Sequence, residues 1–170
     1  MSDNSEIGYS CIGYHGTEYD NALSILRNKS FIQSCTEDEW LGDGVYFFEN
    51  DERQAICFIT KARKVQNYKV IKANIKTKNL LDLIDLETYE NFEQFARQFK
   101  DRYLKKKDNR PRKLINSVVL KAMYNLKPYD VVRAVFPVPQ TQPAPRTNIQ
   151  PMQIQICVKE PKCITDIKEV

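Results

Sequence analysis

The sequence contains only one histidine, only five glycines and no long apolar run. No stretch approaches the roughly 20 apolar residues that a membrane-spanning helix needs, and the N-terminal segment is polar and acidic, unlike a secretory signal. The five cysteines are scattered and form no Cys-x-x-Cys pair. Scattered cysteines without such a pair, together with a single histidine, do not give the spacing of a zinc site, and an odd number of thiols does not suit a disulfide framework. The sequence therefore predicts a cytoplasmic protein without a metal and without a membrane anchor.

Charge is unevenly distributed along a chain that has the size of one domain. A chain of 170 residues with 42% hydrophobic side chains can bury a core without cross-links. Residues 1–60 carry 3 basic and 11 acidic side chains, a net −8, whereas residues 61–170 carry 23 basic and 11 acidic, a net +12. A segregated positive half is typical of proteins that bind polyanions. A basic tail that neutralises an acidic surface, or the footprint of an antitoxin-like partner, would give the same pattern.

Hydrophobic periodicity divides the chain into strands and helices. All five glycines fall within the first 44 residues, so the ligand-binding part is expected there. Asn50 is the expected N-cap of the second helix. Residues 137–151 hold five of the eight prolines and no glycine, which predicts a stiff extended loop. The pattern predicts strands at residues 9–15, 45–48, 68–75, 129–138 and 152–159, helices at 18–29, 51–66, 86–104 and 110–125, and an ambiguous apolar stretch at 79–86.

The single histidine lies in Gly13-Tyr14-His15-Gly16-Thr17, at the end of the first expected strand. A lone histidine is more often structural than functional. Here, however, the glycines let a ligand approach the main chain, and the N–H and C=O of Gly16 form the donor and acceptor pair that a carboxamide needs. Further on, Gly42-Asp43-Gly44 leads into a strand that contains Tyr46. An aromatic ring in such a strand is more often part of the core than a ligand platform.

Taken together and in order, these segments resemble the catalytic domain of poly(ADP-ribose) polymerases. The resemblance implies an α+β ADP-ribosyltransferase fold of the histidine-tyrosine class in one domain, residues 1–170. Two small antiparallel sheets, a split β-sandwich, and flanking helices would enclose an NAD cleft. It also implies that His15 bonds a ribose hydroxyl of NAD, Gly16 holds the nicotinamide carboxamide, and Tyr46 stacks on the nicotinamide ring. The matching segments, within residues 12–58, are Tyr14-His15-Gly16-Thr17, Ala22-x-x-Ile25, Leu41-Gly42-Asp43-Gly44-Val45-Tyr46-Phe47, and Ala55 nine residues after the tyrosine.

Two positions depart from the family pattern. The spacing gives Gln54 where the polymerases have a serine that touches the carboxamide. It gives Cys57, with Phe58 beside it, where they have a second stacking tyrosine. Thr17, Gln54 and Phe58 complete the expected NAD contacts, so the resemblance implies a remodelled nicotinamide site.

The third signature residue of the family is a glutamate on a late strand. Its carboxylate stabilises the positive charge that develops as nicotinamide leaves. Residues 152–159 read MQIQICVK and contain no glutamate. Alternation puts both glutamines on one face, so Gln155 is the expected replacement and Gln153 the second candidate. Alternatively, both face solvent over an apolar core. Glu160 is expected on the apolar face, and Glu49 is a weaker substitute that can equally be an exposed charge.

A glutamine in place of the glutamate narrows the implied reaction. A neutral amide can bond the ribose hydroxyl, but it stabilises a cationic transition state less than a carboxylate does. Family members that lack the glutamate attach a single ADP-ribose or are inactive. The resemblance therefore implies a mono-ADP-ribosyltransferase that releases nicotinamide, and a non-catalytic NAD or ADP-ribose binding module stays open as the alternative.

A basic segment at residues 101–113 points to an acceptor. It holds seven basic residues, two acids and one aromatic. Such runs are usually solvated helix ends. The proline-rich loop, however, falls where the resembling fold has its acceptor-recognition loop, and a basic surface beside it would suit RNA or single-stranded DNA. The candidate nucleic-acid residues are Lys105, Lys106, Lys107, Arg110, Arg112, Lys113 and Arg146.

A stand-alone catalytic domain of this size is similar to the bacterial ADP-ribosylating toxins of toxin–antitoxin and antiviral phage-defence systems, some of which modify nucleic acid. The sequence-based hypothesis is therefore an enzyme that uses NAD as cosubstrate and modifies nucleic acid, with RNA favoured over DNA. Its candidate partner is an antitoxin protein. A protein acceptor is the competing hypothesis.

Overall fold

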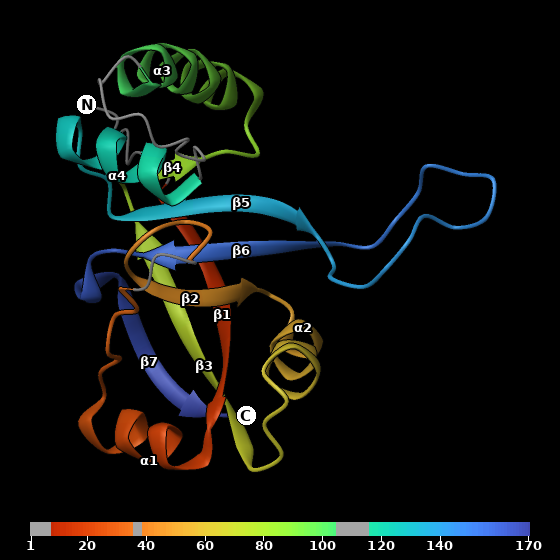
Figure 1. Cartoon of the computed structure of the whole chain (residues 1–170). Coiled ribbons are helices and arrows are strands. Elements are labelled where there is room, and N and C mark those ends of the chain that lie inside the picture. Colours follow the sequence, from red (N-terminus) through yellow and green to blue (C-terminus); the bar gives the residue numbers. More distant parts are fainter. Residues whose placement is uncertain (1–7, 36–38, 105–115) are drawn as a thin grey trace, which may run out of the picture.

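The computed structural model of the chain describes residues 8–35, 39–104 and 116–170, with the backbone alone at residues 101–104. The chain is a mixed α+β structure, as expected (Figure 1). No described helix is both long enough and apolar enough to cross a membrane. The elements are β1 (Tyr9–Glu18), α1 (Tyr19–Asn28), β2 (Val45–Glu49), α2 (Glu52–Cys57) with a π-helical turn (Phe58–Ala62), β3 (Tyr68–Thr77), β4 (Leu80–Asp82), α3 (Leu86–Leu104), α4 (Asn116–Leu126), β5 (Val131–Pro137), β6 (Met152–Val158), a 3-10 turn (Pro161–Cys163) and β7 (Ile164–Glu169).

The strands form one hydrogen-bonded sheet of seven, in the order β4-β5-β6-β2-β1-β3-β7. The expected division into two separate sheets is not seen. Neighbouring strands are antiparallel except β4 and β5, which are parallel. The sheet nevertheless changes direction in the middle: β5, β6 and β2 run across the view, while β1, β3 and β7 run down it (Figure 1). The join between β1 and β2 consists of two register pairs, Gly13 with Glu49 and Tyr14 with Phe48.

Several boundaries differ from those predicted. β1 continues three residues beyond His15, and the ambiguous stretch contributes β4. The second helix is shorter than expected and is capped by Asp51, whose side chain accepts from the N–H of Gln54; Asn50 instead has a left-handed backbone. β7 was not predicted. Its alternation is interrupted where Asp166 takes a left-handed conformation and shifts the pairing with β3.

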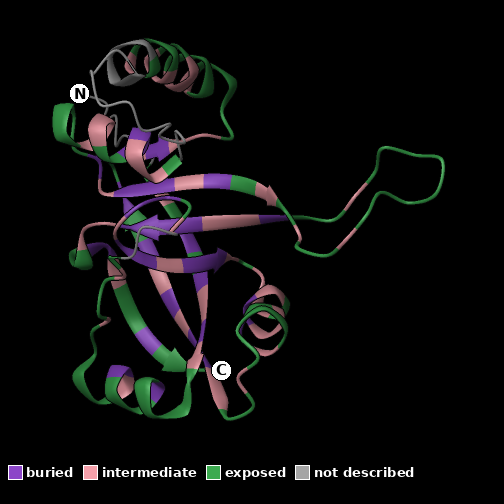
Figure 2. Ribbon diagram, viewed as in Figure 1, coloured by how far each residue is buried: buried purple, intermediate pink, exposed green. Residues whose placement is uncertain are grey.

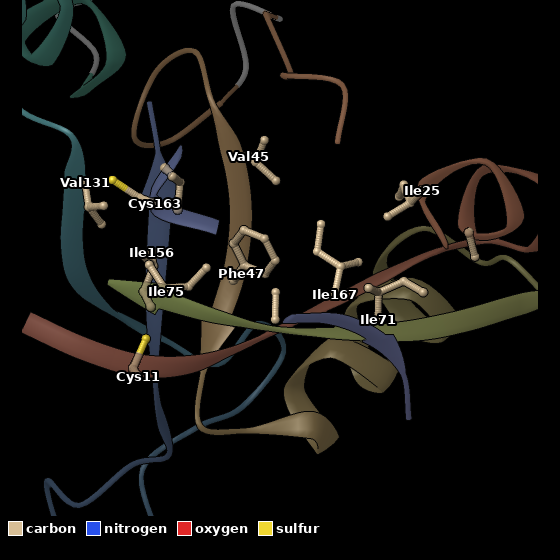
Figure 3. Close-up of a cluster of buried hydrophobic side chains, with 13 residues drawn as sticks. Cys11, Ile25, Val45, Phe47, Ile71, Ile75, Val131, Ile156, Cys163 and Ile167 are labelled. Carbon is tan, nitrogen blue, oxygen red and sulfur yellow. The ribbon is translucent and has the colours of Figure 1, made fainter. Parts of the chain in front are cut away.

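The core has a layer on each face of the sheet, and the buried residues are concentrated in the strands (Figure 2). On one face, α1 covers a cluster that includes Phe47, Ile71 and Ile156 (Figure 3). On the other face, Leu120 of α4 packs with Val132 and other residues over β5 and β6, and Ala55 of α2 belongs to a third, smaller cluster. All five cysteines are free thiols, and Cys11, Cys157 and Cys163 are buried.

The proline-rich segment projects from the body as a long loop between β5 and β6 (Figure 1). Its tip is closed by backbone hydrogen bonds from the N–H of Ala144 to the carbonyl of Ile149 and from the N–H of Thr147 to the carbonyl of Ala144. Arg146 lies in this tip, exposed and with a left-handed φ of 61°. The predicted extended loop is therefore present.

Candidate functional site

The candidate site lies where β1 and β2 part. β1 pairs with β3 along its whole length, but its register with β2 ends at Tyr14. His15 is the next residue, and its Nδ1 lies 2.8 Å from the carbonyl oxygen of Tyr46 on β2. A carbonyl only accepts, so Nδ1 carries the hydrogen, and in the neutral ring Nε2 is an acceptor. The single histidine thus bridges the two strands at the point where their ladder stops.

Burial keeps the His15 ring neutral. Desolvation lowers its pKa below 6.5, and the hydrogen bond to Tyr46 opposes this only in part. The ring makes edge contacts with Phe31 at 5.3 Å and Phe47 at 5.9 Å between centroids. Both phenylalanines belong to the core layer beneath α1. The imidazole therefore sits at the rim of that layer, as a hydrogen-bond acceptor rather than a cation.

Gly16 presents its backbone toward the opening between the strands. The N–H of Tyr19 bonds the carbonyl of Asn67, in line with the β1–β3 register, so odd-numbered residues of β1 bond β3 and even-numbered residues face β2. The N–H and C=O of Gly16 consequently point toward β2, beyond the last register pair. A Cβ at this position would lie 2.5 Å from the carbonyl oxygen of Ala55, so α2 can pack here only against glycine.

Two hydrogen bonds fix the hydroxyl of Tyr46. Its hydroxyl donates to the carbonyl of Gly42 at 2.6 Å and accepts from the N–H of Leu41 at 2.9 Å, and burial raises the pKa of the phenol. Its half-buried ring packs against the cluster beneath α4, on the opposite face from the His15 ring. The two rings therefore do not face each other directly. The two residues lie on either side of the end of the β1–β2 ladder, since no register pair follows Tyr14.

Gln155 lies on β6, the strand that pairs with β2 on the side away from β1. β6 pairs with β2 so that Gln155 is opposite Phe48 and Cys157 is opposite Tyr46. Gln155 is half-buried, whereas Gln153, opposite Phe136 of β5, is only 5% exposed. The predicted alternation is confirmed, and the alternative that both glutamines face solvent is wrong for Gln153, because this face is covered rather than open. Of the two, Gln155 is the one that pairs in register with β2, one strand away from the opening.

Glu49 does not share the face of Gln155. It pairs with Arg133, whose Nε lies 2.5 Å from Oε2, and the same guanidinium bonds both carboxylate oxygens of Asp82. The Glu49 side chain is 9% exposed, so this is a nearly buried ion pair rather than the exposed charge that was the other interpretation. Alternation from Phe48 puts Glu49 on the face opposite that of Gln155. Arg133 was not singled out from the sequence, although a charge within the apolar run VVRAVF is a usable signal.

The remaining predicted contacts lie around or away from the opening. Gln54 is on α2, and Phe58 follows that helix, 40% exposed, with its ring 5.8 Å from that of Phe48. Thr17 lies on β1 opposite Lys69, with its backbone directed toward β3 rather than β2. Arg146 is in the projecting loop. The six other candidate nucleic-acid residues fall outside the described residues: Lys105, Lys106, Lys107, Arg110, Arg112 and Lys113.

A cavity of about 240 Å³ lies next to this region, behind the glycine-rich turn. Gly42 and Asp43 line it, but His15, Gly16 and Gln155 do not. Lys159 also lines the cavity, and its Nζ donates to the carbonyls of Leu41 and Asp43. The residues that line the cavity are Gln33, Gly42, Asp43, Lys121, Tyr124, Asn125, Tyr129 and Lys159. Within the described ranges, no three His, Cys, Asp or Glu side chains are grouped to hold a metal ion.

Comparison with known proteins gives one informative match. An uncharacterized protein of Methanocaldococcus jannaschii is 27% identical over 183 aligned residues, which cover 91% of this chain and 85% of the relative. No protein-family model matches the chain. No solved structure matches it either.

Proposed function

We propose that the chain is an NAD-dependent mono-ADP-ribosyltransferase. The observation that carries the proposal is the opening between β1 and β2, which His15 and Gly16 adjoin, with Gln155 on the far side of β2. Nδ1 of His15 is bonded to the carbonyl of Tyr46, the N–H and C=O of Gly16 face the same gap, and Gln155 lies one strand away. An acceptor nitrogen, a backbone donor and acceptor pair, and a side-chain amide together match the hydroxyl and carboxamide groups of a nicotinamide nucleoside.

Each of these residues would have a role in ligand binding that its hydrogen bonds support. Nε2 of the neutral His15 ring would accept a ribose hydroxyl hydrogen, because Nδ1 is committed to Tyr46. Gly16 would bond the carboxamide through its main chain. The Tyr46 ring, locked through its hydroxyl, would offer a flat apolar surface without a loss of side-chain entropy on binding. Preorganised groups of this kind favour the transition state because they need no rearrangement during reaction.

Gln155 supports transfer of a single ADP-ribose rather than chain growth. Its amide can orient the ribose, but it carries no charge to offset the positive charge that develops as nicotinamide leaves. Glu49 is held by Arg133 on the other face. A non-catalytic NAD-binding module is the competing function, since the same groups bind the ligand in the ground state.

The acceptor that we propose is RNA, and the setting is a bacterial toxin or phage-defence effector, with an antitoxin protein as candidate partner. The +12 net charge of residues 61–170 supports a polyanionic acceptor. Incubation with labelled NAD and a cell extract, followed by nuclease or protease, tests this. Label removed by nuclease is expected, and label removed by protease alone would make the chain a protein modifier.

Nicotinamide release tests the activity itself. The purified protein is expected to release nicotinamide from NAD in a whole-cell extract, and His15→Ala is expected to abolish release. Lys61→Ala, on the exposed turn after α2, is the control. Circular dichroism of both variants separates loss of chemistry from loss of folding. NAD binding without release in any extract would favour the binding module, and an active His15→Ala would refute the site.

A further inference from the structure

One face of the sheet is open to solvent over β1, β3 and β7. The register puts a set of side chains from these three strands on the same face as Tyr14. α1 and its core cluster cover the opposite face. On this face, the small cluster around α2 reaches Tyr14 and Val70. The side chains beyond it are Ser10, Ile12, Lys72, Asn74, Lys76, Thr165 and Lys168, and we call them the lysine face.

The lysine face is positive and accessible. Lys72 lies directly opposite Lys168, and Lys76 is four residues further along β3, about 13 Å away at 3.3 Å per residue. None of the seven residues is acidic. The Lys168 side chain is 59% exposed and pairs at 2.6 Å with Asp166, which lies in the irregular turn of β7. Ile12 is 41% exposed.

One carboxylate faces the paired lysines. Like charges directly opposite each other on neighbouring strands are destabilising, and Asp166, which pairs with Lys168 and is also attracted by Lys72, offsets this repulsion. On the other face of the same strands, Lys69 pairs with Glu169 in the ordinary way. The three lysines of the open face are thus accompanied by the single carboxylate of Asp166, which leaves this face positive.

The lysine face continues into the candidate site. One cross-strand row runs from Gln155 on β6 through Phe48 on β2, Tyr14 on β1 and Lys72 on β3 to Lys168 on β7. Four steps of about 4.8 Å put the two ends about 19 Å apart. The middle of this row is covered, because Phe48 is only 8% exposed and packs with Ala55 and Tyr14, so an RNA strand bound by the lysines would have to pass around α2 to reach Gln155.

We propose that the lysine face binds the phosphodiester backbone of single-stranded RNA and directs it toward the opening between β1 and β2. This rests on the proposed function for the identity of the acceptor, but the binding surface stands by itself. Lysines along a strand neutralise successive phosphates, and the exposed side chain of Ile12 and the half-buried ring of Tyr14 offer apolar contacts to unstacked bases. A single strand fits because its bases are free to make these contacts.

Fluorescence anisotropy with a labelled uridine 16-mer tests the surface in the full-length protein. The triple variant Lys72→Gln/Lys76→Gln/Lys168→Gln removes three charges from the face. Lys61→Gln/Lys64→Gln/Lys100→Gln removes three exposed lysines elsewhere and matches its net charge. The face variant is expected to bind at least about tenfold more weakly than the control, with the slope of log K against log salt reduced by about 2, from a slope of 0.7 per phosphate on single strands. Equal affinities of the two variants would overturn the proposal.

Two further measurements keep the result decisive. Lys72 is half-buried, so Lys76→Gln/Lys168→Gln is measured as well, and loss of binding there with an unchanged melting temperature supports the surface. Polyglutamate of matched charge is the second probe, and binding as tight as that of RNA would overturn the proposal in favour of an acidic polypeptide. NAD binding by the face variant is expected to equal that of the native protein. Absence of NAD binding in both refutes the proposed function and leaves the RNA measurement untouched.

Discussion

The two portions of the sheet differ in how they are covered. β5, β6 and β2 have apolar side chains on both faces, with Ile156 in the cluster that contains Phe47 and Cys157 in the cluster beneath α4, each fully buried. β1, β3 and β7 are buried on one face and carry lysines on the other. The first portion is shaped by packing, while the second leaves a face free for a partner. Their junction is where the backbone of Gly16 is left facing an opening.

The junction itself is held by few interactions. Only two register pairs join β1 to β2, but the ion pair of Glu49 with Arg133 ties β2 to β5, and Nδ1 of His15 ties β1 to Tyr46. The comparison therefore predicts that loss of the buried ion pair acts on stability, whereas substitutions around the junction act on activity, on stability or on both. Four substitutions test this, from the largest expected effect to the smallest.

Arg133→Met is expected to cost about 3–5 kcal/mol of unfolding free energy, because it leaves the carboxylate of Glu49 nearly buried without its partner. Arg97→Met is the control, since Arg97 makes an exposed i,i+4 pair with Glu93, and exposed pairs of this kind contribute little to stability. Urea denaturation of both variants measures the difference. A similar cost for the two would mean that the pair does not hold β2 to β5.

Gln155→Ala is expected to lower turnover by a factor of about 10 to 1,000, the range for one lost transition-state hydrogen bond. Gln153→Ala, on the same strand but 5% exposed, is expected to lower stability and leave turnover nearly unchanged. Gln155→Glu restores a carboxylate and is expected to raise turnover. Rates of nicotinamide release decide among these outcomes, and a more severe loss in Gln153→Ala would transfer the role to Gln153.

The sequence predicted well where the pattern is local. Short stretches of neighbouring residues are enough to predict the helix over residues 18–29, the strand that contains Tyr46 and the alternation in β6. The sequence did not predict β7, because Asp166 interrupts the alternation of this strand. The bond from His15 to the Tyr46 carbonyl joins residues 31 apart, and no periodicity encodes such a contact. The nearly buried position of the Glu49 side chain likewise depends on its ion pair with Arg133, 84 residues away.

Gly16→Ala is expected to destabilise the fold by about 1–3 kcal/mol, since the added Cβ would lie 2.5 Å from the Ala55 carbonyl oxygen and 3.1 Å from Cβ of Ile59. The closer contact is with backbone, which cannot rotate away. Thr17→Ala, one residue along the same strand, is the control. Thermal unfolding gives the comparison, and a native-like Gly16→Ala would show that α2 does not pack as closely on β1.

The smallest expected effect is a loss of stability at mildly acidic pH that depends on His15. Burial lowers its pKa in the folded protein below the ordinary 6.5. Above that pH the ring is neutral in both states and contributes nothing. As the pH falls through 6.5 toward the folded pKa, the unfolded chain takes up a proton that the folded chain refuses, so the unfolded state gains. The native protein should therefore lose stability over this window, and His15→Gln should lose less.

The composition makes this measurement clean, because His15 is the only histidine in the chain. Its Cε1 proton resonance can be followed by NMR without assignment of the rest, and it should titrate below about pH 6.5, the value for an unperturbed histidine. Nicotinamide release should fall over the same range, since protonation removes the acceptor at Nε2 while the bond from Nδ1 to Tyr46 remains. A midpoint at or above the ordinary value would place the ring in water, and the opening between the two portions of the sheet would then not be built around a neutral imidazole.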